Sequence, residues 1–222
     1  MSCHYKTFSL TLVRHAAVNG PHALYGSQCD IACHPEQLQL LEPLSLHDAA
    51  KFTQVYVSPL LRTRETCERL FLNAPIQPVI EPLIQEFNFG VLDGKPFSSY
   101  SPHDNQMLEA FNTDSVNFPL PQGETVTAFA KRIKNFLLEL MLKAQDNDHL
   151  LLITHGGVIA QTLSLILNLP LAQLLISMPA AYTKATRIKL SIPSEANLAS
   201  LTQPQGFFGQ IANFNVRLKD LN

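Results

Sequence analysis

The sequence predicts an α/β protein with a mostly parallel central sheet. Three short apolar runs, 8–13, 54–58 and 149–154, have the length and composition of buried strands. Helical patterns separate them, the clearest at 126–144. Strands that alternate with helices imply right-handed crossovers, which bring the carboxyl ends of the strands to one edge of the sheet. Because ligands of open α/β sheets bind beyond those ends, we expect a functional site there.

Length and composition fit one domain with a sizeable core. The chain has 222 residues, of which 46% are hydrophobic, enough for a single domain with an inserted segment. The charged content of 15% lies below the usual value of about a quarter, which argues against disorder. A net charge of −2 argues against a general polyanion binder, so we expect no nucleic-acid partner.

The chain carries no pattern that would direct it out of the cytoplasm. The first six residues lack the apolar core and cleavage site of a signal peptide, and the longest apolar stretches are too short to span a membrane. The cysteines are too few and too scattered for a disulfide framework: Cys3, Cys29, Cys33 and Cys67. We therefore expect a soluble, cytoplasmic protein with no membrane partner.

The first half of the chain contains two strands that lead into cations. The strand Phe8–Val13 runs into Arg14 and His15, and a loop over 16–35 precedes a predicted helix from Pro35 to about Leu41. The second strand, Gln54–Ser58, precedes a helix over 60–72, for which we expect Ser58 as N-cap and Pro59 at the first position. Arg62 would then lie in the first turn, where the helix dipole is positive. A bound anion there would stabilise it, whereas a solvated arginine is the simpler alternative.

The middle of the chain offers one acidic candidate. Residues 76–80 are a short strand candidate, and Glu86 follows among apolar neighbours. On this stretch alone, a desolvated acid and a surface glutamate are equally good interpretations of Glu86. Residues 95–122 are rich in proline and predict an insertion over one end of the sheet, with a short helical run at 106–112.

The strand at 149–154 repeats the arrangement of the first strand. It ends at His155, and Gly156 opens a helix predicted over 158–167. The backbone N–H groups at such a helix start bind anions well. Residues 186–192 alternate as the last predicted strand, and we assign no function to the tail after them.

Together these strand ends predict a phosphoryl site. Arg14, His15, Arg62 and His155 would converge at one edge of the sheet. Guanidinium groups match the bidentate geometry of a phosphoryl group. A metal site is a poor alternative, because Cys29, Cys33 and His34 have only loosely suitable spacing and no second cluster completes four ligands.

Five segments, in order, resemble the histidine phosphatase superfamily, the phosphoglycerate mutase-like proteins. The similar segments span residues 8 to about 170: Leu12-Val13-Arg14-His15-Ala16, 58–66, 86–94, Gly123-Glu124-Thr125 and Ile153-Thr154-His155-Gly156-Gly157. The resemblance implies a three-layer α/β/α fold, in a single domain over 1–222 with 95–122 as an inserted cap segment. Five other histidines have no place in these segments: His22, His34, His47, His103 and His149.

The sequence departs from the family pattern in two places. Ala16 stands where the family usually has glycine, and the mutase pattern of Glu-Thr followed by Asn is missing after it. Leu24-Tyr25-Gly26, followed by Asp30, is similar instead to the branch of α-ribazole-5′-phosphate phosphatases of cobalamin assembly. Residues 32–52 lack the usual family pattern.

The resemblance implies a reaction through a phosphohistidine, with neither metal nor cofactor. His15 would be the nucleophile, Glu86 the proton donor and then the base, while Arg14, Arg62, His155 and the backbone of Gly156 would hold the phosphoryl oxygens. We expect hydrolysis of a small phosphate ester, with α-ribazole 5′-phosphate as a candidate. Mutase-type phosphoryl transfer and a phosphate-binding regulatory protein without turnover are the alternatives.

Overall fold

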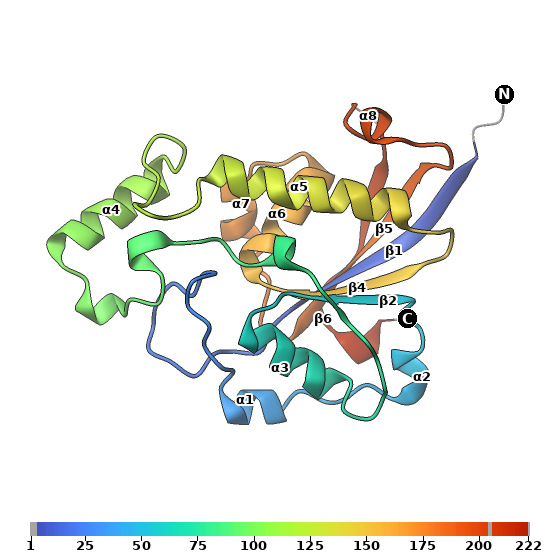
Figure 1. Ribbon diagram of the computed structural model, residues 1–222, viewed down its shortest axis with the longest axis horizontal. Helices are drawn as coiled ribbons and strands as arrows, with labels where there is room; N and C mark the ends of the chain where they lie inside the picture. Colours follow the sequence, from blue (N-terminus) through green and yellow to red (C-terminus); the bar gives the residue numbers. More distant parts are fainter. Residues whose placement is uncertain (1–3, 204–205, 222) are drawn as a thin grey trace.

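The computed structural model describes residues 4–203 and 206–221 and has helices on both faces of one sheet (Figure 1). Within these residues, six strands follow the order β3-β2-β4-β1-β5-β6. Their bounds are β1 Tyr5–Arg14, β2 Gln54–Val57, β3 Val79–Ile80, β4 His149–Thr154, β5 Lys184–Pro193 and β6 Phe208–Arg217. Strands β3, β2, β4 and β1 are mutually parallel, and β5 and β6 are antiparallel to their neighbours. The predicted α/β class with a mostly parallel sheet is confirmed.

The register between the two central strands brings their carboxyl ends level. Arg14 at the end of β1 pairs with Thr154 at the end of β4. The backbone N–H of His15 donates to the carbonyl of Thr154 at 3.0 Å, which continues the ladder by one step. His15 and His155 therefore leave the sheet at the same level on neighbouring strands.

Side chains of the central strands point alternately into two separate hydrophobic cores, one on each face of the sheet. Leu150 and Leu152 of β4 pack on one face, and Leu151 and Ile153 pack on the other. Successive strand residues point to opposite faces, so a continuous apolar run requires cover on both sides. This explains why β4 is the least ambiguous strand in the sequence.

The helices supply that cover. Helix α5 (Val126–Lys143) and α6 (Gly156–Leu167) lie on one face, and α3 (Leu61–Leu70) lies on the other (Figure 1). The N-cap of α5 is Thr125, whose hydroxyl accepts from the N–H of Ala128 at 3.1 Å. The remaining helices are α1 Pro35–Gln39, α2 Leu46–Ala49, α4 Pro102–Thr113, α7 Leu171–Ser177 and α8 Leu198–Leu201, with single 3₁₀ turns at Pro82–Ile84, Gly90–Leu92, Phe97–Ser99 and Leu218–Asp220.

The segment 95–122 contains α4 and is tied to the loop after β1. Helix α4 begins with a capping box between Ser101 and Asp104, and Lys95 pairs with Asp104 at 2.7 Å. The N–H of Phe97 donates to the carbonyl of His22 at 2.9 Å. In Figure 1, α4 projects to the side of the molecule away from the start of β1.

Three predicted boundaries in the first half were wrong. Helix α3 begins at Leu61, and its N-cap is Leu60 rather than Ser58, because the N–H of Leu61 donates to the carboxylate of Asp30 at 2.5 Å. The strand predicted at 76–80 shrinks to Val79–Ile80, since Pro78 lacks the N–H that a ladder needs. The helix predicted to reach Leu41 ends at Gln39.

The tail after β5 is a further correction. Residues 186–192 belong to β5, but β6 follows and pairs antiparallel with it, so they are not the last strand. Most of β6 is only partly buried, which is why it has no clear apolar run. Helix α7 was also not predicted.

The described helices do not individually meet the requirements of a membrane span. None of them is long and apolar enough by itself. Helices α6 and α7 pass the length and composition test only as a pair, with a bend of 119° between them. Cys3 lies outside the described residues.

Candidate active site

The two histidines that follow β1 and β4 lie against each other. Their ring centroids are 5.1 Å apart, with the planes at 62°. His15 is 5% exposed and His155 is fully buried. Arg62, which enters from the first turn of α3, is also fully buried, so the predicted cations and imidazoles do converge at the carboxyl edge of the sheet.

Among the described residues, His15 is held through one ring nitrogen, Nδ1. Its Nδ1 lies 2.7 Å from the carbonyl oxygen of Ala16. A carbonyl can only accept, so Nδ1 carries the proton in the neutral ring and Nε2 keeps a lone pair. Burial, followed by the charge of the Arg62 guanidinium, holds the pKa of His15 well below its usual value, which favours that neutral form.

Ala16 fits this turn despite its methyl group. It is fully buried, and its N–H donates to the Thr66 hydroxyl at 2.9 Å. Its φ is not in the positive region that would require glycine. The backbone at this position therefore serves to orient His15 with alanine in place.

His155 is held through the opposite nitrogen. Its Nε2 lies 2.8 Å from the hydroxyl oxygen of Ser58, which is itself fully buried. Its Nδ1 is buried and has no hydrogen-bond partner among the described residues. Burial and the nearby Arg62 charge hold the pKa of His155 well below its usual value, so this ring is also neutral.

Backbone carbonyls fix the Arg62 guanidinium. It donates to the carbonyls of Tyr25, Gly26 and Cys29 at 2.9–3.1 Å, while its buried Nε has no partner among the described residues. Asp93 holds this loop in turn, because its carboxylate accepts from the N–H of Gly26 at 2.8 Å. Carbonyl dipoles solvate the buried cation in place of water, so it remains available to an anion through Nε.

Arg14 is the more open of the two cations. One of its terminal nitrogens donates to the carbonyl of Ala180 at 2.7 Å, and its Cζ lies 3.7 Å from the centroid of the Tyr182 ring. Its Nε is buried without a partner among the described residues. Gly156 lies beside this guanidinium, where a Cβ would make an ordinary van der Waals contact with the Arg14 Cζ at 3.4 Å.

Glu86 is buried against the start of α6. It is 9% exposed, which favours the buried interpretation over a surface loop residue. Its Oε2 accepts from the N–H of Gly157 at 3.0 Å, and its Oε1 accepts from the N–H of Phe87 at 2.9 Å. A Cβ on Gly157 would clash with Oε1. Glycine at 157 is therefore what lets the carboxyl approach the α6 N-terminus.

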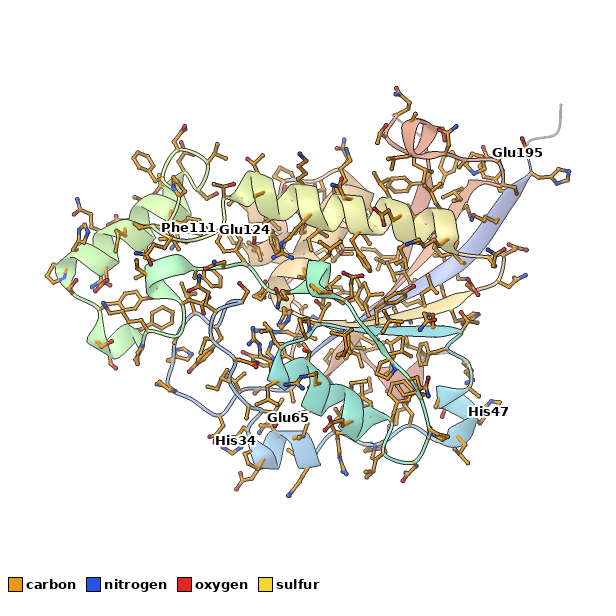
Figure 2. The ribbon with its side chains drawn as sticks, in the orientation of Figure 1. His34, His47, Glu65, Phe111, Glu124 and Glu195 are labelled. Carbon is orange, nitrogen blue, oxygen red and sulfur yellow. The ribbon has the colours of Figure 1, made fainter. Side chains whose placement is uncertain are left out.

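A single arginine of α5 holds the segment that carries Glu86. Arg132 donates to the carbonyls of Leu83, Gln85 and Glu86 at 2.6–3.1 Å. It also forms a two-point pair with the Glu124 carboxylate at 2.7 and 2.9 Å, where α5 begins (Figure 2). These contacts use all five N–H groups of the guanidinium, so the pair positions the backbone of Glu86.

The unpartnered nitrogens define what the site can bind. The Nε atoms of Arg14 and Arg62 are donors, and the Nδ1 of His155 can be one. Buried donors without partners are rare and costly, and a ligand with several acceptor oxygens would satisfy all three. The His155 ring lies 5.1 Å from the ring of His15, and the charges of Arg62 and Arg14 both act on that ring. Within the described residues, no group of three or more His, Cys, Asp and Glu side chains could hold a metal ion.

Sequence reasoning missed several residues of this site. Ser58 was assigned to a helix cap, although its hydroxyl meets His155. Tyr182 lies far along the chain in a loop with no motif, and nothing in the sequence places it beside His15. Arg132 carries no distinguishing signal in the sequence, because Lys131 and Lys134 lie beside it in the same predicted helix. Of the other histidines, His47 lies on α2, away from Glu124 in the view of Figure 2.

Known proteins share this fold and much of this sequence pattern. A "Probable phosphoglycerate mutase GpmB" from Erwinia tasmaniensis is 31% identical over 118 residues, 53% of this chain and 54% of that protein. The chain thus matches about half the length of these curated relatives.

Two solved structures resemble this fold over almost its whole length. The α-ribazole phosphatase from Shigella flexneri superposes with a TM-score of 0.73 at 18% identity, over 96% of this chain and 99% of that one. A mycobacterial glucosyl-3-phosphoglycerate phosphatase superposes with a TM-score of 0.71 at 16% identity, over 94% and 99%. At these identities the likeness is one of fold.

The model of the histidine phosphatase superfamily, branch 1, matches residues 10–192, a span that includes both strand-end histidines, both arginines and the buried glutamate. The predicted resemblance is therefore confirmed, and this chain belongs to the histidine phosphatase superfamily.

Proposed function

We propose that this protein is a phosphomonoesterase that hydrolyses a small phosphorylated metabolite through a phosphohistidine at His15. The observation that carries the proposal is the set of three buried nitrogens, on Arg14, Arg62 and His155, that lack partners among the described residues. They belong to residues that lie against His15 or act on its charge, and the Ala16 carbonyl at Nδ1 leaves the lone pair of this neutral imidazole on Nε2. A phosphoryl group supplies the acceptor oxygens that these nitrogens need.

In the first step, Nε2 of His15 attacks phosphorus and the bond to the ester oxygen breaks. The ester oxygen leaves as an alcohol after taking a proton from Glu86. Arg14 and Arg62 offset the charge on the phosphoryl oxygens, and an N–H on Nδ1 of His155 adds a neutral donor. The contact between His15 Nδ1 and the Ala16 carbonyl stabilises the positive charge that develops on the attacking ring.

In the second step, water attacks the phosphohistidine. Glu86, now a carboxylate, takes a proton from this water, and the P–N bond breaks to release inorganic phosphate and neutral His15. The backbone N–H groups of Phe87 and Gly157 donate to the Glu86 carboxylate, and Arg132 holds the Glu86 backbone. These contacts keep the carboxyl in one place through both steps. Two displacements thus replace one direct attack by water.

For the substrate we propose α-ribazole 5′-phosphate as the first compound to test. The Leu24-Tyr25-Gly26 segment supports it, because this segment resembles that of α-ribazole-5′-phosphate phosphatases. The carbonyls of Tyr25 and Gly26 also place it next to Arg62. The fold likeness to an α-ribazole phosphatase gives further support. Selectivity would come from residues 95–122, because the bond between Phe97 and His22 places the start of this segment against the loop after β1.

The test begins with turnover of p-nitrophenyl phosphate by the purified protein. We expect hydrolysis, and we expect a phosphoenzyme to be trapped when the reaction is quenched in base, since phosphohistidine is stable there. His15→Ala should abolish both, whereas the exposed His47→Ala should change neither. A wild-type protein that binds inorganic phosphate but hydrolyses no ester would identify a phosphate-binding protein instead.

A substrate panel then separates hydrolysis from transfer. It contains α-ribazole 5′-phosphate, phosphoglycerates and sugar phosphates, and the readout is released phosphate beside product analysis. Interconversion of phosphoglycerates without release of phosphate would favour the mutase alternative. Rapid phosphate release from α-ribazole 5′-phosphate, with slow release from the others, would establish the proposed substrate.

A further inference from the structure

The loop at residues 179–183 folds over the open side of the site. The N–H of Thr183 donates to the carbonyl of Arg14 at 3.0 Å, and the carbonyl of Ala180 accepts from the Arg14 side chain. Between these two contacts, the ring of Tyr182 lies over the Arg14 guanidinium and 5.6 Å from the ring of His15. Tyr182 is therefore the aromatic side chain that contacts both the nucleophile and a cation.

The loop is held in place from β6. The side chain of Asn215 accepts from the N–H of Ala181 at 2.9 Å and donates to the carbonyl of Pro179 at 3.0 Å. Thr183 has a φ of 61°, a conformation that a β-branched residue adopts only where its surroundings impose it. A surface tyrosine without a role would need neither feature. The position of the Tyr182 ring is thus built into the fold.

The exposed fraction of Tyr182 indicates that a bound ligand could contact this side chain. Tyr182 is 41% exposed, although one face of its ring covers Arg14, whereas His15 is almost fully buried. An ester bound with its phosphorus at Nε2 of His15 must direct its alcohol portion out of the buried site. The tyrosine lies beside the nucleophile and keeps part of its surface exposed to solvent.

We propose that Tyr182 determines specificity by packing its accessible ring surface against the alcohol portion of the ester, which selects phosphate esters whose alcohol carries an aromatic ring. The inference rests on the phosphomonoesterase proposed above and adds to it the class of leaving group. Aromatic pairs prefer offset or edge-on packing and gain free energy beyond the area that they bury. That gain corresponds to about a 5- to 10-fold preference in kcat/KM.

The experiment compares two esters whose alcohols have similar acidity, 2-phenylethyl phosphate and 2-cyclohexylethyl phosphate. We expect the wild type to prefer the aromatic ester about 5- to 10-fold in kcat/KM. Tyr182→Leu should abolish this preference, and Tyr182→Phe should keep it. Tyr5→Leu, the same change at the exposed start of β1, should leave the preference unchanged.

An equal fall of both esters in Tyr182→Leu would overturn the inference, because Tyr182 would then act only through Arg14. Calorimetric binding of the same two esters distinguishes failure of the inference from failure of the proposed function. If the wild type hydrolyses neither ester and does not hydrolyse p-nitrophenyl phosphate either, the phosphatase is refuted. The role of Tyr182 is then tested by binding alone. Tighter binding of the aromatic ester to the wild type, with equal binding of the two esters to Tyr182→Leu, would support the inference.

Discussion

His15 follows β1 and His155 follows β4, and the protein holds a different ring nitrogen in each. A main-chain carbonyl, that of Ala16, engages Nδ1 of His15. A side-chain hydroxyl, that of Ser58, engages Nε2 of His155. A carbonyl dictates the tautomer, because it can only accept, whereas a hydroxyl can donate or accept. The same residue type at equivalent strand ends can therefore serve as a nucleophile in one place and as a hydrogen-bond donor in the other.

Both rings share one electrostatic condition. Each is buried beside Arg62, and the pKa of each is held well below its usual value. Neutrality is what a nucleophile needs, since a protonated imidazole has no lone pair to offer. For His155, neutrality means that only one nitrogen carries a proton. The proposed division of roles thus depends on hydrogen-bond partners rather than on charge.

The most severe test replaces each histidine in turn. His15→Ala should lower kcat/KM by more than about 10⁴-fold and abolish phosphoenzyme labelling, because the nucleophile is gone. His155→Ala should lower kcat/KM by about 10²- to 10³-fold, the cost of one donor to the transition state, and should still be labelled. Turnover and base-quenched labelling are the measurements. Labelling lost in His155→Ala but kept in His15→Ala would reverse the assignment.

Glu86→Gln should separate proton transfer from attack. A glutamine cannot deliver a proton to the leaving oxygen, so an alkyl phosphate with a poor leaving group should slow by about 10²- to 10⁴-fold. Formation of the phosphoenzyme from p-nitrophenyl phosphate should slow far less, since nitrophenolate leaves without help. Rapid-quench measurement of that step gives the comparison. Equal losses for the two esters would argue against Glu86 as the donor.

The shared neutrality predicts a dependence of stability on pH. The folded-state pKa of both rings lies below 6.5, so the unfolded chain binds more protons once the pH falls below about that value. The contribution is fully present above it and is lost progressively on acidification, by up to about 1.4 kcal/mol per pH unit for each ring.

Urea unfolding between pH 7 and pH 5 measures this loss. His155→Gln should have a shallower slope than the wild type, and His47→Ala should keep the full slope. A free energy of unfolding that does not change between these pH values would mean that neither ring has a lowered pKa in the folded protein.

Ser58→Ala examines the contact that distinguishes the two histidines. Without the hydroxyl, Nε2 of His155 is left unpaired, and we expect about a 10-fold loss of kcat/KM. The ¹⁵N shifts of His155 should show the Nδ1–H tautomer in the wild type and a mixture in the variant. Thr63→Val removes a neighbouring buried hydroxyl that donates to the Ser58 carbonyl, and it should leave the shifts of His155 unchanged.

Much of the fold was predictable because the central strands carry apolar residues on both faces. A run such as Leu150–Ile153 has few alternatives to a buried strand, and the helix at 126–143 shows its core stripe directly. Strand β6 was not predictable, because it is partly exposed and has no such run. Pro78 marked the limit of β3 in the sequence, and the prediction of a longer strand overlooked it.

Some residues of the candidate site were predictable from the sequence, and others were not. His15 and His155 were predictable because each directly follows a recognisable strand. Tyr182 was not, since its place depends on a loop that Asn215 holds from β6. Hydrogen bonds to main-chain carbonyls, like those of Arg132, leave no trace in local composition. Contacts of this kind become visible only when the chain is folded.

The parallel pairing of Arg14 with Thr154 makes residue count more critical than residue identity along β4. Insertion of one residue within this strand would turn His155 away from His15 and exchange the side chains that face the two cores. The turn before β4, around Asn147, could absorb the same insertion without that penalty. Among relatives of this protein, length differences should therefore gather in that turn and be excluded from the strand itself.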